Sequence, residues 1–175
     1  MLLTHEPLLV PLYNGMRCTY TEHETLADDG FQYEIIQGVL SMVPAPMWGH
    51  QNLVFKLAQQ LGNFLDKHPL GVLGIAPLDV KFSETLKYQP DILYVSQERR
   101  HIITSKCVTA APDWVVEVLS DATRRRDQKD KFEDYQRYGV QEYWVMDPDS
   151  ISQSQFFVLR SGKYEPFQPH NSIIT

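Results

Sequence analysis

One short segment limits the possible folds of this chain more than any other. Residues 114–119, WVVEVL, are apolar at every position except Glu117. A strand that is apolar on both faces is normally buried on both faces. An unpaired carboxylate in such a strand is costly or becomes neutral. Glu117 therefore indicates a bound cation, a buried arginine or lysine partner, or a strand end that reaches solvent.

A second acid stands in the same kind of position. Asp91 follows Pro90 and comes directly before the apolar run 92–95. Carboxylates at neighbouring strand ends can share one cation, and Mg²⁺ needs few protein ligands because it keeps several waters. The alternative is that Pro90-Asp91 only starts a turn. Asp113 is a competing acid, but four strand residues separate it from Glu117, about 13 Å, so we interpret Asp113 as a strand-entry turn.

The following segment supplies a cation at a suitable spacing. A helix is predicted from about 124 to 138, and Gly139 suits the position just after its end. Asp127, Lys131 and Tyr135 then share one helix face. On a helix packed beside the Glu117 strand, the Lys131 ammonium could reach the carboxylate. The alternative is an exposed, salt-bridged helix surface.

The remaining patterns predict a mixed α/β domain. An irregular arm, 1–18, precedes the first element, and the chain as a whole, 1–175, is expected to form one domain. The order of elements predicts a central sheet flanked by helices. The other predicted elements are a short helix to Leu26, a hairpin of 33–37 and 39–43, a helix over 49–67, strands at 72–82, 92–95, 114–119 and 143–146, and a terminal hairpin of 156–159 and 164–167.

Charge and composition exclude some classes of protein. The net charge of −6 argues mildly against a surface coated in basic residues, although a local basic strip and an acidic metal site remain compatible with it. No apolar stretch approaches the roughly 20 residues of a spanning helix. The first residues lack a basic and then apolar signal pattern. Cys18 and Cys107 form no Cys-x-x-Cys pair, so a reduced, cytoplasmic protein is the expectation.

Taken together, these residues resemble a known motif. Pro90-Asp91 followed by 117–119, EVL, is similar to the PD-(D/E)xK motif of restriction-endonuclease-like nucleases. The wider similarity, to one large bacterial family of such nucleases, covers about residues 19–160. It rests on YEIIQG at 33–38, Pro46 with His50, QPD at 89–91, VEVLS at 116–120, Thr123 with Asp127 and Lys131, and GVQEYW at 139–144 with Asp147-Pro148.

One position departs from the general motif. Leu119 stands two residues after Glu117, where the motif has its lysine. In the resembling family the lysine is displaced to the following helix, and Lys131 occupies the matching place. Such a displacement is chemically acceptable, because catalysis requires the ammonium at the site and not at a fixed sequence offset.

The resemblance implies a restriction-endonuclease-like fold and a metal-dependent endonuclease that hydrolyses phosphodiester bonds in DNA. Asp91, Glu117 and the backbone carbonyl of Val118 are then expected to hold Mg²⁺ or Mn²⁺, with Lys131 orienting water or stabilising the developing charge. Glu34 matches a further acid of the site, with an exposed strand residue as the alternative. His50 matches as well, either as a phosphate ligand or as a helix cap.

Other functions and partners stay open at this point. A catalytically silent nucleic-acid-binding or protein-interaction module of the same fold is the main alternative. A small-molecule phosphohydrolase is a third possibility, but the chain has no G-x-x-x-x-G-K-[ST] phosphate loop. A homodimer is expected from the resemblance, with Phe156, Phe157 and Tyr164 of the terminal hairpin either forming its contact or belonging to the core.

Overall fold

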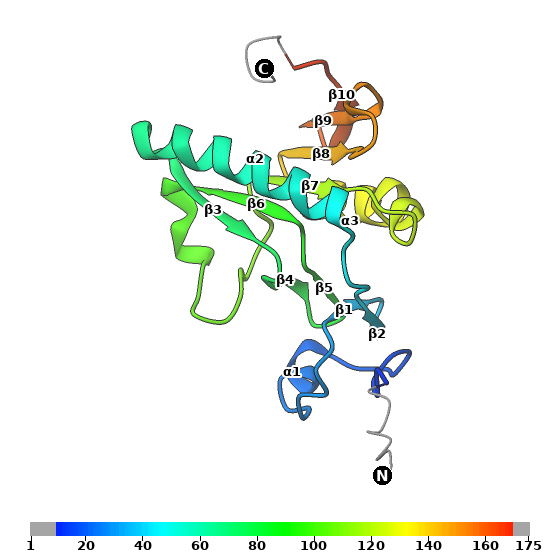
Figure 1. The fold of residues 1–175 in the computed structure, drawn as a ribbon. Coiled ribbons are helices and arrows are strands. Elements are labelled where there is room, and N and C mark those ends of the chain that lie inside the picture. The colour runs from blue at the N-terminus through cyan, green and yellow to red at the C-terminus, as the bar shows by residue number, and fades with distance from the viewer. Residues whose placement is uncertain (1–9, 170–175) are drawn as a thin grey trace, which may run out of the picture.

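The strands pair into two sheets, which Figure 1 shows as a larger upper and a smaller lower layer. The structure, a computed structural model, describes residues 10–169. The smaller sheet has the order β2-β1-β5-β4, in which every pairing is antiparallel. Its strands are β1 (Tyr33–Ile36), β2 (Val39–Met42), β4 (Val80–Ser83) and β5 (Leu86–Tyr88).

The larger sheet has the order β10-β9-β8-β7-β6-β3. Only β7 and β8 run parallel, so this sheet is mixed. Its strands are β3 (Gly71–Ile75), β6 (Ile92–Ser96), β7 (Trp114–Val118), β8 (Glu142–Met146), β9 (Gln155–Arg160) and β10 (Lys163–Pro166). All five residues of β7 are buried, as its apolar sequence predicts.

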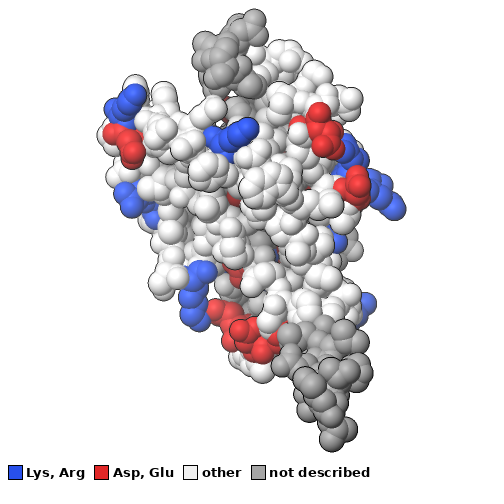
Figure 2. Space-filling view, viewed as in Figure 1, with Lys and Arg blue, Asp and Glu red and all other residues white. Residues whose placement is uncertain are grey.

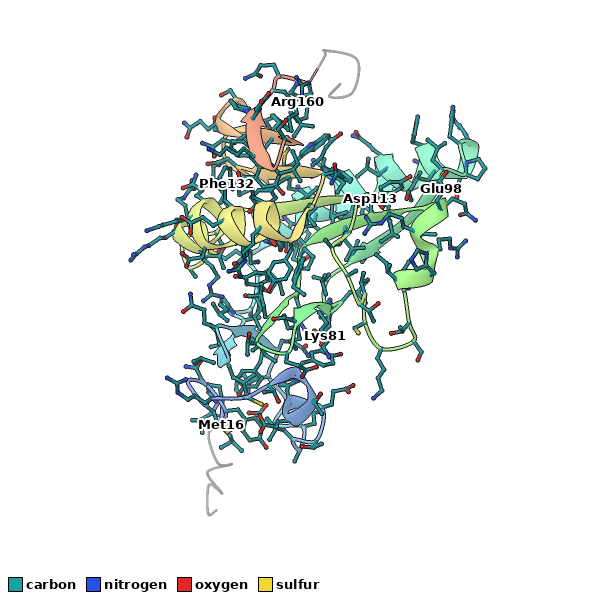
Figure 3. The ribbon with its side chains drawn as sticks, turned by 180° about the vertical axis from the view of Figure 1, so that it is seen from behind. Met16, Lys81, Glu98, Asp113, Phe132 and Arg160 are labelled. Atoms are coloured by element: carbon teal, nitrogen blue, oxygen red, sulfur yellow. The ribbon has the colours of Figure 1, made fainter. Side chains whose placement is uncertain are left out.

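Two helices cover opposite faces of the larger sheet. The long helix α2 (Trp48–Lys67) lies across the front in Figure 1, and α3 (Lys131–Tyr138), which carries Phe132, lies across the other face in Figure 3. The alternation of β7 separates two cores, with Val116 facing α2 and Val115 facing α3. Glu117 therefore points toward α3. The short helices are α1 (Tyr20–His23), the 3-10 turns Gln97–Ile102 and Ile151–Gln153, and the π-helical turn Arg126–Asp130.

The mixed α/β architecture with flanking helices is confirmed, but two details of the expectation were wrong. The run 72–82 is not one strand, because it splits into β3 and β4, which belong to different sheets. Pro77, which has no N–H to donate to a ladder, lies between them. The strand β5 was not anticipated, and it completes the second sheet.

Near its two ends, the described chain holds the irregular arm and the terminal hairpin. Part of the expected irregular arm, residues 1–9, lies outside the described residues, and the remainder joins β2 through a bridge between Arg17 and Val39 and a hydrogen bond from the Gly15 N–H to the Leu40 carbonyl. In the terminal hairpin Phe156 and Tyr164 are buried, which is the core alternative. Over residues 10–169, none of the helices combines the length and the apolar character needed to cross a membrane.

Candidate active site

A buried ion pair joins α3 to β7. Lys131 Nζ lies 2.9 Å from Glu117 Oε1, and both side chains are no more than 5% exposed. The Tyr135 hydroxyl donates a second hydrogen bond to the same oxygen at 2.6 Å. The position predicted for the Lys131 ammonium, beside the Glu117 carboxylate and shielded from water, is confirmed. The catalytic role of the pair stays a prediction.

Two further acids surround the same ammonium. Glu34 Oε1, from β1 of the smaller sheet, lies 3.2 Å from Lys131 Nζ, and Asp127 Oδ1 lies 3.5 Å away. Glu34 is buried, so the exposed-strand alternative for it is wrong. Its other oxygen, Oε2, pairs with Arg126 Nη1 at 3.0 Å. The cluster thus draws its members from both sheets and from the helix between them.

Local backbone structure explains how the helix supplies three of these side chains. The predicted helix from about 124 to 138 contains a π-helical turn, in which the Lys131 N–H bonds to the Arg126 carbonyl five residues earlier. This wider turn directs Arg126, Asp127 and Lys131 toward the sheets. The hydroxyl of Tyr143, in β8, donates a hydrogen bond to the Asp127 carbonyl at 2.8 Å and so holds the turn against the sheet.

Asp91 lies at the junction of the two sheets, between β5 and β6. Its Oδ2 accepts a hydrogen bond from the Val118 N–H at 2.7 Å, so Asp91 is tied to the residue that follows Glu117. Asp113, the competing acid, instead accepts hydrogen bonds from the Ser96 N–H and from Arg99, in agreement with a role in strand entry. A cation shared by Asp91 and Glu117 stays a prediction.

His50 contacts the same carboxylate from the first turn of α2. Its Nε2 lies 3.1 Å from Asp91 Oδ2. Burial opposes the charged imidazole, but the hydrogen bond and the negative charge of Asp91 outweigh burial, so the pKa of His50 is raised above its ordinary value. The sequence left two roles open for His50, that of a phosphate ligand and that of a helix cap. In the structure its side chain contacts Asp91.

The cluster holds more negative than positive groups. Four carboxyl groups, those of Glu34, Asp91, Glu117 and Asp127, stand against the Lys131 ammonium, the Arg126 guanidinium and the His50 imidazole, so acids outnumber basic groups even with the imidazole charged. Burial disfavours the Lys131 ammonium, yet Glu117, Glu34 and Asp127 outweigh burial and raise the pKa of Lys131 well above its ordinary value. The lysine is therefore cationic.

Burial and the neighbouring acids also shift the pKa values of two of these carboxyl groups. Burial raises the pKa of Glu117 well above its ordinary value, with Lys131 opposing and Asp127 and Asp91 adding to the rise. Burial also raises the pKa of Asp127, again against the pull of Lys131. Either a proton or an added cation would relieve this repulsion.

The donor set fits a hard divalent cation. The available ligand atoms are carboxylate oxygens, which Mg²⁺ and Mn²⁺ prefer. Asp127 Oδ1 is buried and has no hydrogen-bond partner within the described part of the chain. Over residues 10–169, no group of three or more His, Cys, Asp or Glu side chains has the arrangement of a metal site. A cation here would therefore rest on two carboxylates, a backbone oxygen and water.

Sequence reasoning missed two members of the cluster. Arg126 was not among the residues predicted for the site, but it bonds to Glu34 and to the Ser41 hydroxyl. Asp127 was named beside Lys131, on the same helix face and in the family resemblance, but was not predicted to belong to the site. Arg124, by contrast, lies outside the cluster and pairs with Asp147 at 3.1 Å. The three consecutive arginines carried no signal for which of them turns inward.

A separate hollow of about 960 Å³ lies between α2 and strands β6 to β8. Its wall is mainly apolar and includes Leu57, Trp114 and Trp144, and the acid cluster is not part of it. The face that carries α2 is largely uncharged, with basic side chains that stand singly or beside acids (Figure 2). We therefore place the candidate active site at the acid cluster and not in this larger hollow.

Comparison with known proteins identifies the family and the fold of the chain. A family model named Uma2, described as "Putative restriction endonuclease", matches residues 20–173. A solved structure from Anabaena variabilis ATCC 29413, described as a "putative nuclease belonging to DUF820", is 21% identical, with a TM-score of 0.68 over 85% of this chain and 83% of that one. At that identity the likeness shows the fold. No curated protein matches the chain.

Proposed function

The chain belongs to the Uma2 family of restriction-endonuclease-like proteins, and from this premise we propose that it is a metal-dependent endonuclease acting on DNA. One observation carries the proposal. A cationic lysine is held 2.9 Å from a buried glutamate inside a cluster with excess acid. Perturbed, paired ionisable groups of this kind gather at catalytic sites more often than elsewhere.

In the proposed mechanism, Asp91, Glu117 and the Val118 carbonyl would hold Mg²⁺ or Mn²⁺. The metal would lower the pKa of a bound water and offset the charge of the scissile phosphate. The N–H of Val118 bonds to Asp91, so the strand end aligns the predicted ligands. All of these ligands are oxygens, which favours Mg²⁺ or Mn²⁺ over structural Zn²⁺.

Lys131 would act on the charge that develops during hydrolysis. Its ammonium is fixed by Glu117, Glu34 and Asp127, so its position is set before substrate arrives. A preorganised cation of this kind stabilises a transition state without reorganisation. Glu34 positions the ammonium, and Arg126, which is partly exposed, can turn from Glu34 toward a flanking phosphate.

One observation favours the silent module as a second candidate. The side chains of Lys131 and Glu117 are only 4–5% exposed, so substrate must open the cluster to reach them. A protein that kept the fold for binding alone would retain the buried pair as a structural link between α3 and β7. The two candidates differ in whether DNA is cut.

A cleavage assay tests the proposal. Purified protein is incubated with supercoiled plasmid, linear DNA and single-stranded DNA, each with Mg²⁺, Mn²⁺ or EDTA. We expect cleavage of at least one substrate with either metal and none with EDTA, and Asp91→Ala should abolish it. Binding without cleavage under every condition would instead support the silent module.

A further inference from the structure

His50 makes a contact that neither helix formation nor packing requires. It lies in the first turn of α2, where the helix dipole disfavours a cation and favours an acid. Its side chain does not cap the helix. Its Nε2 reaches Asp91 Oδ2 at 3.1 Å, and its Nδ1 is buried without a hydrogen-bond partner among residues 10–169.

The contact is directed at one oxygen of Asp91. Oδ2 accepts from His50 Nε2 and from the Val118 N–H, which come from α2 and β7 respectively. Within the described residues, both hydrogen bonds of the carboxylate fall on Oδ2, which leaves Oδ1 for a ligand. Two donors from different elements hold Oδ2 in place, and a fixed Oδ2 limits rotation of the carboxylate.

We propose that His50 is a positioning residue that orients the Asp91 carboxylate for the divalent cation. This inference rests on the proposed function, since it concerns the predicted metal ligand. Donors that hold a ligating carboxylate raise metal affinity by limiting its rotation, and their removal typically costs about 10–100-fold in affinity. His50 itself does not touch the metal.

The test measures Mn²⁺ affinity by calorimetry on the full chain without DNA, so it is independent of cleavage. In His50→Gln the amide nitrogen takes the place of Nε2, whereas the shorter amide of His50→Asn falls short of Asp91. We expect His50→Asn and His50→Ala to weaken Mn²⁺ binding by about 10–100-fold, and His50→Gln to stay near wild type. His68→Ala, at the exposed far end of α2, is the matched control and should bind normally.

If His50→Ala fails to fold, the comparison of His50→Gln with His50→Asn still tests the inference, because both variants keep an amide side chain at this position. Equal Mn²⁺ affinity in the Gln and Asn variants overturns the inference and leaves the proposed function standing. A wild-type chain that binds no Mn²⁺ overturns both. Weak binding in Asn with retained binding in Gln supports a positioning role, which a purely structural link would not produce.

Discussion

The molecule buries two lysines, and their surroundings differ. Lys87 in β5 is 1% exposed and pairs with one acid, Asp79, at 3.0 Å. Asp79 remains 20% exposed and receives a further hydrogen bond from Gln89 at 2.7 Å. Lys131 is almost as deeply buried, but it meets three acids that are themselves buried.

This difference distinguishes the structural ion pair of Lys87 with Asp79 from the candidate catalytic pair of Lys131 with Glu117. The Lys87 pair balances in charge and touches water through Asp79, so it needs no further ligand. The Lys131 cluster has more acids than cations, and burial, with the neighbouring acids adding to it, raises the pKa of Glu117 and of Asp127. Burial of a lysine alone therefore says little about function, whereas the imbalance of charge around Lys131 supports the proposed cation site.

The largest effect is expected from Lys131→Ala. Removing the ammonium takes away the cation proposed to stabilise the developing charge, so cleavage of plasmid DNA should fall by at least about a hundredfold. The buried acids also lose their partner, so the free energy of unfolding should fall by about 3 kcal/mol. Cleavage is measured below the melting temperature of the variant. Wild-type cleavage by Lys131→Ala would make the displaced-lysine interpretation wrong.

Lys87→Ala should show the reverse pattern. Asp79 loses its ammonium but keeps water and Gln89, so we expect the free energy of unfolding to fall by about 2 kcal/mol. Cleavage should stay within a few-fold of wild type, because Lys87 does not contact the acid cluster. Urea unfolding and the plasmid assay measure the two effects. A large loss of cleavage in a folded Lys87→Ala chain would remove the distinction between the lysines.

Asp127→Asn tests the charge excess with a nearly isosteric change. Burial raises the pKa of Asp127, so burial opposes its charged form, and the amide avoids that cost. Without metal, we therefore expect the free energy of unfolding to rise, as measured by urea unfolding. A clear drop in thermal stability would show that the Asp127 charge is needed to hold Lys131.

The smallest effect is expected from Lys129→Ala. Lys129 is exposed, two residues before Lys131 and on another side of the helix. Its removal should change the free energy of unfolding by less than about 0.5 kcal/mol and leave cleavage unchanged. The variant also controls for loss of one positive charge near the site. A loss as large as that of Lys131→Ala would point to general electrostatic attraction of DNA.

Much of the site could be predicted because its residues break local patterns. Glu117 interrupts an apolar strand, and the strand is buried at every position. Lys131 shares a helical face with Tyr135, and both contact Glu117. Such inferences need only strand and helix periodicity, which the sequence carries directly.

The division into two sheets could not be predicted in the same way. The strand β5 has only three residues, Leu86–Tyr88, with a lysine at its centre, and only tertiary packing buries that lysine. The split of 72–82 did carry a local signal, since Pro77 should have ended a strand. The inward position of Arg126 could not be predicted either, because its partners Glu34 and Ser41 lie far away in the sequence.

The position of a bound Mn²⁺ tests the central claim most directly. Crystals grown with MnCl₂ would locate the ion by its anomalous scattering. We predict one ion between the free oxygen of Asp91 and the Glu117 carboxylate, with Lys131 still beside Glu117. Mn²⁺ found only at surface acids, with the cluster around Lys131 closed and unchanged, would contradict the claim and leave the cluster a structural ion pair like that of Lys87.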